Sequence, residues 1–382
     1  MSSEHHRSIA LLQQLVALPS VNPGYDVSSP GEIHVARFIE RWADALGLCV
    51  EHQQVMEGRH NVIVRIVNRD EFPTLLFESH MDTVSIAPGT RGGFDPTIAD
   101  DRMYGRGTCD TKGSMAAMMT AIEELLPQRD RLSCNVEFLA AVGEENGGTG
   151  VLAYIATNPK IAAAVVGEPT SNLIVYGHKG AIRGEIVVTG KAAHTSIAHE
   201  GINAIDAMAD VIAQLRMVSA SLQSIPSGGS LTISLIRGGT GVNIVPEECV
   251  IGYDRRTVPG ETTEKVLAEI DSTLDEARRL RPDVSIARAV PFLNSAPLDT
   301  ALDADIVLAA QSAASEIGLD PTPGVVPYGS DASRLQGGAG IDCIVFGPGS
   351  IDHAHGADEF VPLAEVIAST EFYTKLALAF GR

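Results

Sequence analysis

Residues 135–147 read NVEFLAAVGEENG, an apolar run that leads directly into two adjacent glutamates, Glu144 and Glu145, and then into glycine. A short run that is nearly continuous in apolar residues is typical of a strand buried on both faces. Two like charges at the end of such a strand repel each other and lose hydration. We therefore expect a buried strand here with a positive charge beside its end.

Similar runs recur along the chain and alternate with helical stretches. The runs expected to be strands are NVIVRIV (61–67), TLLFESH (74–80), NVEFLAAV (135–142) and AAAVVGEPT (162–170). The helical stretches between and beside them are GSMAAMMTAIEELL (113–126) and TGVLAYIA (149–156). This alternation predicts a doubly wound α/β domain, with a mostly parallel sheet covered on both faces.

The pattern changes after Tyr176 to alternating strands and two long amphipathic helices, at about 201–222 and 261–281, which predicts a smaller α+β unit. Apolar strand character returns in GIDCIVFGPG (340–349), followed by a C-terminal helix. The second unit is therefore expected to be inserted into the first. We place the first segment of the α/β domain at 1–176, the inserted unit at 177–290 and the second segment of the α/β domain at 291–382.

Composition limits the function classes. The 382 residues are 45% apolar and 20% charged, as in an ordinary folded domain, and carry a formal net charge of −20. Nucleic acids and anionic membranes select a basic surface, so neither is expected as a partner. No apolar run reaches membrane-spanning length, and the opening MSSEHHRSIALLQQLVALPS resembles an amphipathic helix more than a signal peptide.

The five cysteines are scattered and include no CxxC pair. A disulfide framework and a thiolate zinc site are therefore not expected, and reduced thiols in the cytoplasm fit best.

Acids and histidines follow the ends of the predicted strands, where ligands bind in open α/β sheets. They are His80 and Asp82, Asp110 in a glycine-rich loop, Glu144 and Glu145, Glu168, and His353 and His355. These nitrogen and oxygen donors suit zinc, manganese or cobalt, and a bridging carboxylate would suit two metals. One of the adjacent glutamates could bind metal while the other takes a proton from water.

Simpler interpretations exist for each motif. His80 and Asp82 could belong to a polar loop, Asp110 could cap the following helix, and GEENGG could be an exposed acidic turn. A nucleotide site is disfavoured, because Lys112, Gly113 and Ser114 stand in the wrong order for a Walker loop and Asp110 replaces a required glycine.

The motifs together resemble the acetylornithine deacetylase and succinyl-diaminopimelate desuccinylase family of di-zinc aminoacylases and peptidases. The resemblance spans nearly the whole chain and rests on SHMDTV, GRGTCDTKGSMAAMM, GEENGGTG, VGEPT, GHKGAIRGEIVVTGKAAHTS and FGPGSIDHAHGADEF. It is strongest toward acetylornithine deacetylase.

The resemblance implies a role for each matching residue. His80 and Glu168 would bind one metal, Glu145 and His355 the other, and Asp110 would bridge the two. Glu144 would be the general base, Asp82 would support His80, and His353 would be a bystander.

In the inserted domain, three residues match family positions of the lid. His194 would reach the active site of a neighbouring subunit, and Asn243 and Arg256 would contact the substrate carboxylate. The family therefore implies a homodimer formed through the inserted domain.

These inferences predict a metal-dependent hydrolase that cleaves the amide bond of an N-acyl amino acid. A dipeptidase, carboxypeptidase or desuccinylase of the same family is the first alternative. A non-catalytic metal-binding protein with the same fold is the alternative from another class, and Glu144 speaks against it. Asp331 could bind a substrate ammonium group or be structural.

Overall fold

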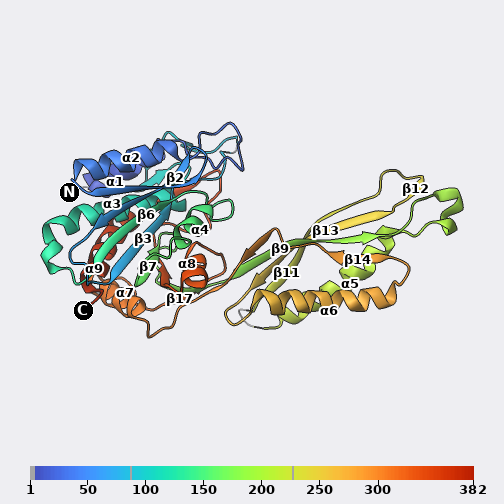
Figure 1. Cartoon of the computed structure of the whole chain (residues 1–382). Coiled ribbons are helices and arrows are strands. Elements are labelled where there is room, and N and C mark those ends of the chain that lie inside the picture. The colour runs from blue at the N-terminus through green and yellow to red at the C-terminus, as the bar shows by residue number, and fades with distance from the viewer. Residues whose placement is uncertain (1–4, 87, 226–227) are drawn as a thin grey trace. The chain divides into compact units, whose positions relative to one another are not determined.

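The structure is a computed structural model that describes residues 5–86, 88–225 and 228–382 (Figure 1). Residues 1–4 of the expected N-terminal helix lie outside this description, and the helix itself is α1 (Arg7–Val16). The chain divides into two compact units. The first comprises residues 1–177, 298–326 and 330–382, and the second comprises residues 178–297 and 327–329.

The first unit is built on a nine-stranded sheet. In spatial order its strands are β1 (Cys49–Met56), β2 (Arg59–Ile66), β6 (Asn135–Ala141), β3 (Thr74–His80), β7 (Ala163–Val166), β18 (Asp342–Val345), β8 (Val175–His178) and β16 (Leu298–Asp299), with β17 (Gly324–Val326) beside β8. The central strands β6, β3, β7 and β18 are parallel, whereas β1, β2 and β8 pair antiparallel. The predicted α/β class with a mostly parallel central sheet is confirmed.

Helices cover both faces of this sheet (Figure 1). One face packs against α1, α2 (Ile33–Ala45), α3 (Gly113–Leu125), α7 (Asp305–Glu316) and α9 (Leu363–Ala379), and the other against α4 (Thr149–Ile155) and α8 (Ala332–Ala339). Successive residues of β3 show why its sequence is continuously apolar. Leu75 and Phe77 belong to the first core and Leu76 to the second, because side chains alternate across a strand.

A small three-stranded sheet completes the first unit. It consists of β4 (Thr97–Ala99), β5 (Arg102–Tyr104) and β19 (Phe360–Pro362).

The second unit has one antiparallel sheet with helices on one face. Its strands are β11 (Ser230–Gly238), β13 (Glu248–Thr257), β9 (Gly180–Thr189), β14 (Ser285–Arg288) and β15 (Leu293–Ser295), and its helices are α5 (Ala204–Gln223) and α6 (Thr263–Leu280). A two-stranded ladder joins β10 (Ala193–His194) to β12 (Ile244–Val245). Residues 293–295 belong to this sheet because β15 pairs with β9.

Within the described part of the chain, none of the helices combines the length and the apolar character needed to cross a membrane. All five cysteines are free, and four of them are buried.

Candidate metal centre

The candidate site lies where the parallel strands of the first unit end. Because β3 lies between β6 and β7 and runs parallel to both, their carboxyl ends meet at one edge. His80 is the last residue of β3, Glu144 and Glu145 follow β6, and Glu168 follows β7. His355 comes from the loop after β18, the next parallel strand. Sheet pairing therefore brings together side chains that are far apart in the sequence.

Six side chains form two groups of three donors. In each group the donor atoms lie within 4.8 Å of one another, and the groups are His80, Glu144 and Glu168, and Asp110, Glu145 and His355. The family resemblance makes Glu144 the general base, whereas it makes the other five residues metal ligands. Donor distances alone do not separate a metal ligand from a neighbouring base.

Asp110 connects the two groups. It lies in an irregular turn, Thr108–Lys112, that leads into α3. One of its carboxylate oxygens lies 3.1 Å from Nε2 of His80, and the other lies 3.1 Å from Nε2 of His355. The same His355 nitrogen lies 3.1 Å from Glu145. Asp110 therefore has one oxygen facing each group, as a bridging carboxylate requires.

Asp82 holds the loop that carries the two glutamates. Its carboxylate accepts the backbone N–H groups of Glu144 and Glu145, both at 3.1 Å, and the side-chain amide of Asn22 at 2.7 Å. Nδ1 of His80 lies 2.9 Å from the Asp82 main-chain carbonyl and 3.5 Å from its carboxylate. We expected Asp82 to support His80. Both acceptor groups of Asp82 lie near the His80 ring, with the main-chain carbonyl nearer than the carboxylate.

Two supporting residues escaped the sequence analysis. Asn22 lies 60 positions before Asp82, and Glu359 lies about 250 positions after the turn that it supports. Glu359 accepts the backbone N–H of Cys109 at 3.2 Å and of Asp110 at 3.4 Å, and it pairs with buried Arg106. Neither contact has a local signal in the sequence, because the partners lie far apart along the chain.

The electrostatics of the site reflect crowded, buried carboxylates. Burial raises the pKa of Glu144 to about 8 and that of Glu168 well above its usual value. Burial opposes ionisation of Asp110 as well, but hydrogen bonds from His355 and His80 hold its pKa below the ordinary value. Hydrogen bonds to Asp110 and Glu145 raise the pKa of His355 to about 10. A bound cation would relieve this concentration of negative charge.

The donor set fits divalent metals. Two imidazoles and four carboxylates converge on one edge with no sulfur among them, a chemistry that suits zinc, cobalt or manganese. The bridging position of Asp110 suits a pair of ions rather than one.

His353 and His355 have different surroundings. The His353 ring packs against Phe360, with the ring centroids 4.1 Å apart and the rings tilted by 34°, whereas His355 contacts two carboxylates. His355 has a φ of 62°, which is uncommon for a residue with a side chain and accompanies functional positions more often than chance.

Asp331 is fully buried beside Glu144. It accepts a hydrogen bond from Arg334 at 2.8 Å, and Arg334 lies 3.8 Å from Glu144. Arg334 was not singled out from the sequence. This pairing gives Asp331 a structural partner within the chain.

The three lid candidates belong to the second unit. His194 is exposed in β10 and its Nδ1 lies 2.7 Å from the Ser196 hydroxyl. Asn243 is exposed, and the side chain of Arg256 donates to Asp254 at 2.8 Å.

The parallel sheet and the two joined donor groups at its edge define an α/β protein with a candidate two-metal centre. The chain belongs to Peptidase family M20/M25/M40, whose profile matches residues 76–379, and is a hydrolase of that family.

Two curated relatives show what the chain resembles. A probable carboxypeptidase of Aspergillus clavatus is 30% identical over 95% of this chain and 86% of its own. An acetylornithine deacetylase of Yersinia pseudotuberculosis is 30% identical over 96% of both chains.

Solved structures share the fold. Aminopeptidase PepT of Bacillus cereus superposes with a TM-score of 0.81 at 23% identity and covers 100% of both chains. The YXEP protein of Bacillus subtilis, described as a dinuclear metal-binding peptidase of the M20 family, has a TM-score of 0.76 at 18% identity, and the match covers 99% of this chain and 98% of that protein.

The two histidines of DHAHG provide a matched pair for a test of the donor set. We expect His355→Ala to lower the metal content of the purified protein, because a donor of the second group is lost. His353→Ala should leave the content unchanged, and metal analysis of both variants is the measurement. The opposite result would place the donor at His353.

Proposed function

We propose that the protein hydrolyses the amide bond of an N-acyl amino acid, as an acetylornithine deacetylase does. The observation that carries this proposal is the carboxylate of Asp110, with one oxygen 3.1 Å from His80 and the other 3.1 Å from His355. The Yersinia relative at 30% identity favours this substrate class. The free thiols fit a cytoplasmic location.

The chain would hold two divalent ions, with Zn²⁺ as the first candidate and Co²⁺ or Mn²⁺ as alternatives. His80 and Glu168 would hold one, Glu145 and His355 the other, and Asp110 both. When bound, such ions polarise an acyl carbonyl and lower the pKa of water.

Glu144 would act as the general base. Its carboxylate takes a proton from the attacking water and then delivers it to the amine nitrogen as the C–N bond breaks. Asp82 keeps Glu144 in place through the backbone N–H. The products are a carboxylic acid and a free amino acid.

The second unit would supply residues that bind the substrate and stabilise the reaction. Arg256 would pair with the substrate carboxylate beside Asn243, and His194 would donate to the oxyanion of the partner subunit's site. These roles rest on the family resemblance.

A carboxypeptidase or dipeptidase activity is the second candidate, favoured by the carboxypeptidase relative from Aspergillus. It uses the same chemistry, because a peptide is itself an N-acyl amino acid. A desuccinylase differs only in the acyl group.

A substrate panel tests the proposal. Metal-loaded protein is incubated with N-acetyl, N-succinyl and dipeptide substrates, and the released amine is measured. We expect the N-acetyl amino acids to be cleaved fastest. Faster dipeptide cleavage would establish the second candidate, and metal binding without any turnover would show a non-catalytic protein.

The adjacent glutamates should respond differently to substitution. Glu144→Gln keeps the side-chain volume and should retain the metal, while activity falls by about 100-fold or more because the base is lost. Glu145→Ala should lose metal as well as activity. Metal analysis and turnover rates of the two variants are the measurements, and equal metal loss in both would make Glu144 a ligand.

Mixed dimers test whether His194 acts across subunits. His194→Ala and Glu144→Gln chains, each nearly inactive alone, are allowed to exchange. If His194 serves the partner's site, one site of each mixed dimer carries both changes and the other carries neither. Up to half of the wild-type activity should then return. If mass measurement verifies subunit exchange and no activity returns, His194 either acts within its own chain or has no role in the reaction.

A further inference from the structure

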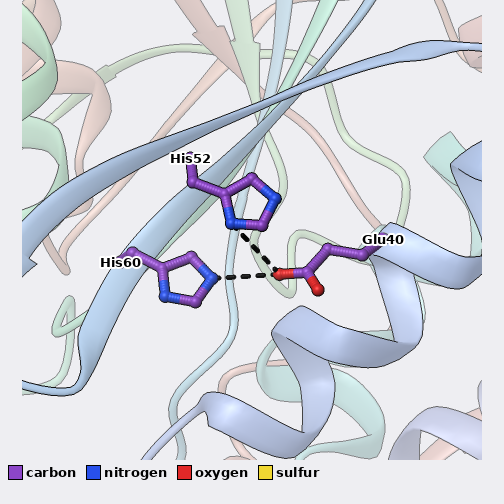
Figure 2. Close-up of side chains that lie close together, drawn as sticks. All are labelled: Glu40, His52 and His60. Atoms are coloured by element: carbon purple, nitrogen blue, oxygen red, sulfur yellow. Dashed lines mark hydrogen bonds and ion pairs between the residues drawn. The ribbon is translucent and has the colours of Figure 1, made fainter.

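A third cluster of metal-type donors lies in the first unit and shares no residue with the candidate centre. Glu40 of α2, His52 of β1 and His60 of β2 point toward one another (Figure 2). Nε2 of His60 lies 3.0 Å from Oε1 of Glu40, and Nδ1 of His52 lies 3.6 Å from the same oxygen. The three donor atoms all lie within 4.8 Å of one another.

The strand register places both histidines on one face of the hairpin. His52 pairs with Val62, which lies two residues from His60, so the two side chains are diagonal neighbours on the same side. The two imidazole rings stack, with their centroids 5.0 Å apart and an interplanar angle of 11°. Val62 packs in the core beneath α2, and this face therefore meets the helix that carries Glu40.

Hydrogen bonding alone leaves part of this arrangement unexplained. The contact between His60 and Glu40 is an ordinary hydrogen bond, whereas 3.6 Å between His52 and Glu40 exceeds hydrogen-bonding distance. Donors around a tetrahedral zinc ion lie about 3.3 Å apart when the bonds are about 2.0–2.1 Å long. The separation between His60 and Glu40 is 3.0 Å and that between His52 and Glu40 is 3.6 Å, so the two lie on either side of that value.

The surroundings would let an ion enter and complete its coordination. The His52 side chain is 51% exposed, whereas Glu40 is 21% and His60 15% exposed. Glu40 and His60 are thus largely covered by protein, whereas His52 is exposed to solvent. Water can fill the remaining coordination position, as in other three-ligand sites.

We propose that Glu40, His52 and His60 bind one further divalent transition-metal ion of the zinc type. Two imidazoles and a carboxylate favour such ions over Mg²⁺ or Ca²⁺, which prefer oxygen. The ion would link α2 to the β1–β2 hairpin. Because β1 is the edge strand of the sheet, the link would stabilise an edge that has a neighbour on one side only.

Counting bound metal tests the proposal in the full-length, metal-loaded protein. Native mass spectrometry in dilute Zn²⁺ should show one zinc ion fewer per chain in His52→Gln and in Glu40→Gln than in the wild type. His34→Gln is the matched control, since His34 is an exposed histidine of the same helix and lies outside the cluster. It should bind as much zinc as the wild type.

A second measurement locates the ion. Zinc should slow backbone hydrogen exchange in α2, β1 and β2 of the wild type and of His34→Gln, but not of His52→Gln. Because His52 is half exposed, its substitution should leave the fold and amide hydrolysis intact. Equal zinc content in the wild type, His52→Gln and Glu40→Gln would overturn the proposal, whatever the activity against N-acyl substrates.

Discussion

The crowding of buried carboxylates at one edge of the parallel sheet is the constraint on which the site depends. Glu144, Glu145, Glu168 and Asp110 occupy a region where each negative charge disfavours the others, and burial strengthens that repulsion. The fold holds the three glutamates there through pairing of β3 with β6 and β7, because the strand ends before them cannot separate without breaking the core. Asp110 is held by the turn that leads into α3. Packing in the sheet thus sustains an electrostatic arrangement that is unfavourable without a cation.

Backbone contacts of two further acids make the arrangement specific. Asp82 accepts the N–H groups of Glu144 and Glu145, and Glu359 accepts those of Cys109 and Asp110. Neither carboxylate has to bind a metal ion to influence the positions of the donor residues. Each fixes the main chain from which donors project, so that the donors stay in place when the charges on their side chains change.

The cluster of Glu40, His52 and His60 arises from a different kind of contact. The candidate centre uses strand ends and a turn, whereas this cluster uses the side of an edge hairpin that faces helix α2. Its donors are fewer and more open to solvent, which suits a stabilising link rather than catalysis.

The central strands of the sheet, the α/β class and the donor motifs could be predicted from the sequence, because apolar runs and the acids beside them are local signals. The edge strand β1 was not expected. The sequence also led us to expect a positive charge beside Glu144 and Glu145, because two adjacent acids follow a buried strand. Only the tertiary structure joined Asn22 to Asp82 and Glu359 to Asp110, since these partners are distant in the chain and carry no local pattern. The proximity of His52, His60 and Glu40 likewise depends on strand register and helix packing. These place side chains in three dimensions and leave no periodic pattern in the sequence.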